Sequence, residues 1–126
     1  MAHRIRAVRD PDEYRATLAV IGHYFGWQPT SVDAERMSAL MPPERVFAAF
    51  DGDEIVGGAG AYPLELTVPG ARLPCAGVTV VGVLPSHRRQ GLMTRLMRAQ
   101  HREIREREEP LAGLWASEAT IYGRYG

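Results

Sequence analysis

The order of hydrophobic patterns along this chain predicts an α/β fold in which a mixed central sheet is flanked by helices. Two observations support that prediction. Short apolar runs separated by tight turns over residues 46–68 are typical of antiparallel hairpins. From Val78 to Trp115 the pattern is strand, helix, strand, which normally forms a right-handed crossover between parallel strands. A sheet with both kinds of neighbour is mixed.

The bulk composition indicates one ordinary globular domain covering residues 1–126. Hydrophobic residues make up 45% and charged residues 24%, which argues against disorder. Fifteen basic and fifteen acidic residues cancel. A nucleic-acid partner or an anionic membrane surface is therefore disfavoured, because either would be matched by a net basic face.

The cysteine content and the hydropathy pattern bear on the compartment. A single cysteine, Cys75, excludes an internal disulfide and a zinc site built from cysteines, and it fits a reducing environment. The first ten residues lack the apolar core of a signal peptide. No apolar run approaches the roughly 18 residues of a membrane span. We therefore expect a cytoplasmic protein with no membrane partner.

The first elements are marked by local capping signals. A short strand is predicted over Arg4–Val8. Asp10 then precedes Pro11 at a first helical position, and Glu13 follows three residues on, which is a capping-box pattern. Apolar residues at three- and four-residue steps continue this helix to about Phe25.

A second helix and a run of hairpin strands follow. The helix is predicted to begin at Ser31 or Asp33 and to end at the two prolines at 42 and 43. A strand over Val46–Phe50 then turns at residues 51–53. The return strand begins at Ile55, with an expected interruption at Tyr62-Pro63, a continuation over Leu64–Val68, a turn at 69–70, and a return into the strand at Val78.

The stretch from Val78 to Arg98 has the features of an anion site. An apolar, β-branched run ends at Pro85 and is followed by a short basic turn and Gly91. After Gly91 the apolar period changes from two to about 3.6, which predicts a helix. A helix N-terminus offers unpaired N–H groups and a positive dipole end, and Arg88 and Arg89 add charge. The alternative is a solvated basic turn.

The end of the predicted sheet lacks a cover. A last strand is predicted over Leu111–Ala116, and Ser117 and Glu118 suggest a new helix start. A parallel strand with only a fragment of helix behind it leaves one sheet edge or face exposed. We therefore expect that something covering this edge is missing from the chain or is supplied by a partner, and that the chain is incomplete and could form a homo-oligomer.

Two segments together resemble the GNAT superfamily of N-acetyltransferases. The strand and turn from Val81 to Gly91 are similar to its acetyl-coenzyme A signature, an apolar strand followed by Arg or Gln, two residues, Gly, one residue, and Ala or Gly. The last signature position here is Met93, which departs from that pattern. The segment from Ala119 to Gly126 resembles the family's tyrosine segment.

The same segments look most like the Eis-type (enhanced intracellular survival) members of that superfamily. Members of this type are much longer, so the chain resembles the N-terminal acetyltransferase domain of one, apparently truncated. The implied fold is the GNAT fold, with a mixed central sheet flanked by helices and with the C-terminal strands missing.

The resemblance implies that the co-substrate is acetyl-CoA and that no metal takes part. The pyrophosphate would lie on the turn before the predicted helix, and the pantetheine arm would pair with the backbone of the preceding strand. The cofactor-binding residues are then Val81, Val83, Arg88, Arg89, Gly91, Leu92 and Ser117. Ser117 could equally be a helix N-cap, and the side chains of Val81 and Val83 could be core.

The resemblance also implies a general acid. Tyr122 matches the family's tyrosine, which would protonate the departing thiolate after an amine attacks the thioester. A phenol with a pKa near 10 is protonated at neutral pH, which suits that role. A backbone N–H near Val81 could polarise the thioester carbonyl. The implied reaction is acetyl transfer to a primary amine of an aminoglycoside, polyamine or lysine-type substrate.

The general base is not indicated by spacing. Four residues are candidates without a constellation: Glu65, Glu118, His87 and His23. His87 is better explained as a solvent-facing turn residue. His3 and His101 have no partner at helical spacing that would make a metal site.

Two further alternatives stay open. The aromatic residues Tyr24, Phe25 and Trp27 beside the first helix break could line a site for a cationic amine, but a core role is favoured. A domain without its last strands could also bind coenzyme A without turnover, as a regulatory or assembly module.

Overall fold

The computed structural model describes residues 3–126, and it places five strands in one sheet in the order β1-β2-β3-β4-β5. The pairs β1–β2, β2–β3 and β3–β4 are antiparallel, and the pair β4–β5 is parallel. The mixed sheet predicted from the sequence is therefore confirmed. The strand bounds are β1 Arg4–Ala7, β2 Val46–Asp51, β3 Glu54–Val68, β4 Ala71–Val83 and β5 Leu111–Gly113.

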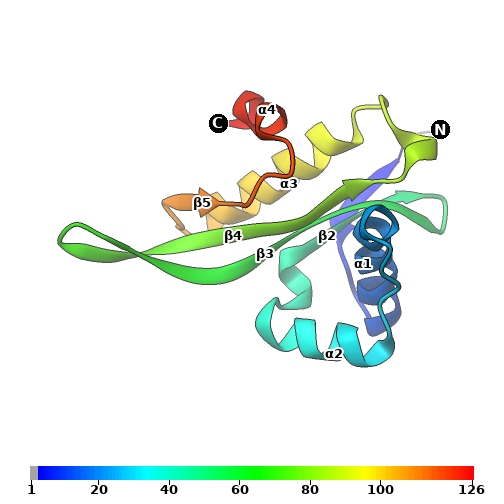
Figure 1. Ribbon diagram of the computed structural model, residues 1–126, viewed down its shortest axis with the longest axis horizontal. Helices are drawn as coiled ribbons and strands as arrows, with labels where there is room; N and C mark the ends of the chain where they lie inside the picture. Colours follow the sequence, from blue (N-terminus) through cyan, green and yellow to red (C-terminus); the bar gives the residue numbers. More distant parts are fainter. Residues whose placement is uncertain (1–2) are drawn as a thin grey trace.

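Helices cover both faces of this sheet (Figure 1). α1 (Pro11–Phe25) and α2 (Ser31–Leu40) lie on one side, and α3 (Leu92–Glu106) lies on the other. The short α4 (Ala119–Tyr122) follows β5 and lies beyond α3 (Figure 1). Three 3-10 turns complete the elements: η1 Pro43–Arg45, η2 Pro85–His87 and η3 Gly123–Tyr125.

The helix starts follow the capping signals of the sequence. The Asp10 side chain accepts the Glu13 N–H at 2.8 Å, and Pro11 is the first residue of α1, as predicted. α2 begins at Ser31, and the cap is the preceding residue, Thr30. Thr30 and Asp33 form a reciprocal capping box, with the Asp33 N–H donating to Thr30 Oγ1 at 3.1 Å.

Three strand predictions are corrected by the pairing. β3 continues through Tyr62-Pro63 without a break, because β2 pairs only as far as Gly60 and a proline is tolerated where one side of a strand is free. β4 begins at Ala71 rather than near Val78. β5 ends at Gly113, not Ala116, because its ladder with β4 stops there.

The core is divided between the two faces of the sheet. On the α1 face, Tyr14 and Leu18 pack against β2. On the α3 face, Leu92 and Leu96 pack against Ala49 and other small residues of β2 and β3. The glycines of β3 permit this close approach: a Cβ at Gly58 would lie 2.4 Å from Thr17 Cγ2 of α1.

Candidate acyl-transfer site

The two parallel strands separate partway along β4. β5 pairs with β4 only from Cys75 to Gly77, whereas β4 continues to Val83. Beyond Gly77 the side of β4 that faced β5 has no neighbouring strand in the described part of the chain. An unpaired strand edge presents N–H and C=O groups that an extended ligand can pair with, as an added strand would.

A bulge lies where the strands separate. Gly58 pairs with Gly82 and Gly60 pairs with Thr79, so β4 carries one residue more than β3 between these pairs. Val80 lies within this bulge and has φ +48, which is unusual for a β-branched residue. A bulge bends its strand and increases the local twist, and this one lies just beyond the last pair between β4 and β5.

An apolar cavity of about 860 Å³ occupies the region between the separated strands. Its walls come from both strands, from the end of α1, and from the segment after β5. Val78 to Val81 of β4, Trp115, Ser117 and Tyr122 all line it. The volume falls within the range of small-molecule sites, roughly 300–1,000 Å³. The cavity thus brings the predicted cofactor strand and the predicted acid to one place.

The turn after β4 leaves the N-terminus of α3 uncapped and accessible to an anion. η2 leads into Arg89 with φ +62 and Gly91 with φ +77, and Gly91 is the N-cap of α3. No side chain caps this helix, and its first turn contains no acidic residue. A Cβ built at Gly91 would have no atom within 4 Å, so the approach to the first N–H groups is open. The helix and turn predicted from the sequence are both present.

The two arginines of the turn differ in their contacts. Arg88 donates from its guanidinium to the Tyr24 hydroxyl, at 2.9 Å from one terminal nitrogen, and lies 5.2 Å over the Tyr24 ring. Tyr24 in turn donates to the carbonyl of Val83, at the end of β4. Arg89 is exposed. A chain of contacts therefore joins α1, β4 and the basic turn.

The remaining predicted cofactor residues are partly or wholly in the core. Leu92 is 2% exposed and packs with Leu96, so its side chain is structural and only its backbone could meet an anion. Val81 and Val83 are half-buried against the α3 face, and Val81 also reaches the cluster around Ile104. All three side chains pack against the core, and Val81 also lines the cavity.

Tyr122 lies half-buried at the end of α4, on the wall of the cavity. Burial raises its pKa above the ordinary value of 10.0, and the neighbouring Tyr125 adds to that shift. The Tyr125 hydroxyl lies 3.1 Å from Thr94 Oγ1 of α3 and ties this segment to that helix. Ser117 lines the same cavity, and it is not the N-cap of α4, because Glu118 takes that position.

None of the four candidate bases lines this cavity within residues 3–126. Glu65 is exposed and lies 3.9 Å from Arg72, and Glu118 and His23 are also exposed. His87 is not the solvent-facing residue we expected. Its side chain is only 15% exposed, and its Nε2 lies 2.8 Å from Asp51 Oδ2 at the end of β2.

The aromatic cluster is not the core that the sequence favoured. Phe25 is 68% exposed and Tyr24 is 39% exposed. Trp27 is half-buried and packs against the α1-side core. Phe25 and Trp27 line the 860 Å³ cavity, so two of the three residues belong to the site.

Three features of the site and of the turn beside it could not be found from the sequence. The Val80 bulge, the bridge from Arg88 through Tyr24, and the contact between His87 and Asp51 all join segments far apart in the chain. The one available signal was the glycine-rich stretch of β3, since glycines within a strand often mark a bulge.

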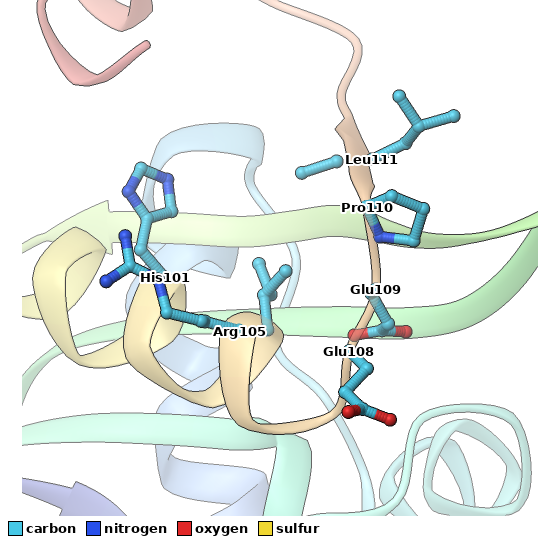
Figure 2. A pocket seen from close by; sticks show the side chains of 8 residues that line it. His101, Arg105, Glu108, Glu109, Pro110 and Leu111 are labelled. Carbon is cyan, nitrogen blue, oxygen red and sulfur yellow. The ribbon is translucent and has the colours of Figure 1, made fainter.

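Within residues 3–126 the outer edge of β5 has no neighbouring strand, which agrees with the uncovered edge expected from the sequence. β5 is the last strand of the sheet, and Trp115 just beyond it is fully exposed. A second hollow of about 410 Å³ lies at this edge (Figure 2). Figure 2 shows His101 and Arg105 of α3 on one side of it and Pro110 and Leu111 on the other. It does not include any predicted site residue.

Of the helices that the structure describes, none combines the length and the apolar character needed to cross a membrane.

Comparison with known proteins agrees with the fold and with the resemblance noted in the sequence. A family model described as an acetyltransferase (GNAT) domain matches residues 4–126. An uncharacterized N-acetyltransferase of Streptomyces avermitilis is 41% identical over 127 residues, which cover 100% of this chain and 31% of that protein. The N-acetyltransferase Eis of Mycobacterium tuberculosis is 43% identical over 103 residues, which cover 78% of this chain and 25% of that protein.

Solved structures show the same similarity in three dimensions. The crystal structure of Eis1 from Mycobacterium abscessus superposes with a TM-score of 0.84 at 37% sequence identity, covering 98% of this chain and 30% of that one. An acetyltransferase from Kribbella flavida superposes with a TM-score of 0.85 at 23% identity, which supports the fold alone. The chain thus spans about a third of the length of these relatives.

Proposed function

Because the chain belongs to the GNAT acetyltransferase family, we propose that it supplies the acetyl-CoA-binding part of an N-acetyltransferase that acts on a primary amine. The observation that carries this proposal is the position of the free edge of β4, between the basic turn and the cavity lined by Tyr122. The basic turn matches the pyrophosphate of the co-substrate, the free edge of β4 matches its amide-containing arm, and the cavity matches its thioester.

The fit of the pyrophosphate rests on the start of α3. Gly91 leaves the first N–H groups of the helix accessible, and the helix dipole favours negative charge there. Arg89 is exposed and free to turn toward a phosphate. Arg88 donates to an uncharged hydroxyl, so it can exchange Tyr24 for a phosphate oxygen and form a stronger, charge-assisted bond.

The pantetheine arm would lie along the second half of β4, where no strand competes for the backbone. Val81 contributes backbone groups there, and its N–H polarises the thioester carbonyl. The Val83 carbonyl accepts a hydrogen bond from the Tyr24 hydroxyl. An incoming amide N–H would therefore either share this carbonyl with the hydroxyl or displace the hydroxyl from it. Ser117 lies on the opposite wall and can bond to the arm.

The reaction then needs two proton movements. A neutral amine attacks the thioester carbonyl, so that a C–N bond forms and the C–S bond breaks. The amine loses a proton to a base, and the departing thiolate takes one from the Tyr122 hydroxyl. Burial raises the pKa of Tyr122 above its ordinary value, which keeps the phenol protonated at neutral pH, as a general acid requires.

The acceptor is a primary amine of the aminoglycoside, polyamine or lysine class. The aromatic residues at the mouth of the cavity, Phe25 and Trp27 with Tyr62, support this class because their ring faces attract cations. The single cysteine, Cys75, is buried and free, which fits a protein of the cytoplasm.

The open edge of β5 supports self-association of the chain. An unpaired strand with exposed apolar neighbours such as Trp115 favours pairing with another copy. Light scattering should find dimers or larger species of this chain at micromolar concentration. A monodisperse monomer that melts cooperatively would contradict this expectation.

A second candidate function is coenzyme A binding without turnover. It is favoured by the lack of any candidate base on the cavity wall within residues 3–126. Acetyl-CoA binding, measured by calorimetry, tests both functions. Thiol release from acetyl-CoA with a polyamine present separates them, because only an acetyltransferase consumes the thioester.

The informative comparison is between this chain and a version extended to the length of its relatives. Binding and turnover by both would support the acetyltransferase. Binding by both with turnover by the longer chain alone would assign this chain the binding role. Failure of both chains to bind acetyl-CoA would refute the proposal.

A further inference from the structure

A cluster of three metal-ligating side chains lies outside the proposed acyl-transfer site. His3 precedes β1, Asp51 ends β2, and His87 ends η2. Their nearest ligand atoms all lie within 4.8 Å of one another, and all three residues are half-buried. The segments that carry them are far apart in the chain, so no local spacing in the sequence could indicate this cluster.

The ligand set suits a borderline divalent cation. Two imidazoles and one carboxylate are a common zinc triad, with a fourth position left for water. In a tetrahedral zinc site the bonds are about 2.0–2.2 Å long, which places ligand atoms roughly 3.3 Å apart. The His87 Nε2 and Asp51 Oδ2 are 2.8 Å apart, and the His3 ligand atom lies within 4.8 Å of both.

The ring of His87 is held by a second contact that favours metal binding. Ser86 Oγ lies 2.7 Å from His87 Nδ1. A metal-bound imidazole usually donates its other N–H to an oxygen, which fixes the ring and its tautomer. Ser86 can accept that N–H and so leave Nε2 to face the cation.

The positions of the other two ligands are also fixed. Arg95 of α3 donates to the His3 carbonyl at 2.7 Å, and the His3 and His87 rings lie edge to face at 5.7 Å between centroids. Arg4 donates to the Gly52 carbonyl at 2.9 Å, next to Asp51.

We propose that His3, Asp51 and His87 form a binding site for a zinc-type divalent cation, which clamps the N-terminal segment and the β2–β3 hairpin to the basic turn after β4. His87 directly precedes Arg88, so the clamp would fix the start of the turn that leads to α3. The site is separate from the acyl-transfer cavity, since none of its three residues lines that cavity. Its role would be structural.

Zinc titration of the whole chain tests this proposal. The chain is prepared without a polyhistidine tag, stripped with a chelator, and titrated with zinc chloride by calorimetry, with Tm measured in parallel. We expect one zinc per chain and a higher Tm with zinc, because a ligand that binds only the folded state stabilises it. The His3→Ala, Asp51→Asn and His87→Ala variants should each weaken zinc affinity by at least about tenfold.

His101→Ala is the matched control, since His101 lies on α3 outside the cluster. It should bind zinc as the parent chain does. Asp51→Asn keeps the shape of the side chain and its bond to His87, so loss of zinc in that variant cannot be ascribed to unfolding. Absence of zinc binding, unchanged binding in all three cluster variants, or equal loss in His101→Ala would overturn the site. No acetyl-CoA is present, so the result is independent of the proposed function.

Discussion

The two halves of β4 belong to one continuous strand but have different surroundings. The half that ends at Gly77 pairs with β3 on one side and, at its last three residues, with β5 on the other. Cys75 and Ala76 are buried there. The half from Val78 to Val83 pairs with β3 alone, contains the bulge at Val80, and is mostly half-exposed.

This difference shows how one strand can serve both stability and binding. A fully paired strand has no backbone groups left for a ligand. An unpaired edge inside a domain leaves N–H and C=O groups without partners, which costs free energy unless something pairs with them. The bulge and the short β5 create such an edge over a few residues only. We therefore expect changes around the paired half to alter folding, and changes around the open half to alter binding or turnover.

The largest effect is expected at Tyr122, which lines the same cavity as the open half. Tyr122→Phe removes the proposed acid and keeps the ring. Turnover, measured as thiol release from acetyl-CoA, should fall about 10²–10⁴-fold, or about 2.7–5.4 kcal/mol. Acetyl-CoA affinity should change little. Tyr125→Phe is the control, because that hydroxyl bonds to Thr94 instead. Equal turnover in Tyr122→Phe and the parent chain would remove Tyr122 as the acid.

The paired half is probed by Ile104→Ala. Ile104 of α3 is buried in one cluster with Ala61 of β3 and Ala76 of β4, and its truncation leaves a cavity. We expect the free energy of unfolding in urea to fall by about 2–5 kcal/mol. Acetyl-CoA affinity of the folded protein should stay within about twofold. Val32→Ala, at an exposed position on α2, should cost less than about 0.5 kcal/mol. A binding defect without a stability defect in Ile104→Ala would break the division between the two halves.

The sequence predicted the helix starts well, because their signals are local. Asp10, Pro11 and Glu13 mark the start of α1 within four residues of one another, and Gly91 marks the start of α3 in the same way. The strand bounds were predicted less well: the open half of β4 was expected, but its paired half, from Ala71, was not. The length of β5 depends on where its ladder with β4 stops, and no residue of β5 itself encodes that point.

The contacts of the candidate site were the least predictable part. Tyr24 was favoured as core, yet its hydroxyl joins Arg88 to Val83, 64 and 59 residues away in the chain. His87 was expected to face solvent, yet it bonds to Asp51, 36 residues away. Such pairs depend on how distant segments pack, which periodicity and capping rules do not describe. The resemblance to a family indicated where a site lies. It did not indicate which side chains contact the basic turn between β4 and α3.

The phosphate turn at the end of the open half is tested by Gly91→Asp. A carboxylate at the N-cap of α3 would repel a pyrophosphate, and φ +77 disfavours any side chain. Acetyl-CoA affinity, measured by calorimetry, should fall at least about tenfold, or about 1.4 kcal/mol. Gly70→Asp is the matched control: its φ is +80, and it lies in the turn between β3 and β4, remote from the site. It should carry the same backbone cost without the loss of affinity. Unchanged affinity in Gly91→Asp would contradict the phosphate turn.

The smallest effect is expected at the bridge between the turn and the open strand. Tyr24→Phe removes the hydroxyl that accepts from Arg88 and donates to Val83. The free energy of unfolding should fall by about 0.5–1.5 kcal/mol, toward the lower end because Tyr24 is partly exposed. Arg88→Gln, alone and combined with Tyr24→Phe, completes a double-mutant cycle that isolates the contact. We expect a coupling energy of at least about 0.5 kcal/mol without co-substrate and a smaller one with saturating acetyl-CoA, because Arg88 would then bond to phosphate. Equal coupling in both states would mean that Arg88 keeps its contact with Tyr24 and that Arg89 alone supplies side-chain charge to the phosphate turn.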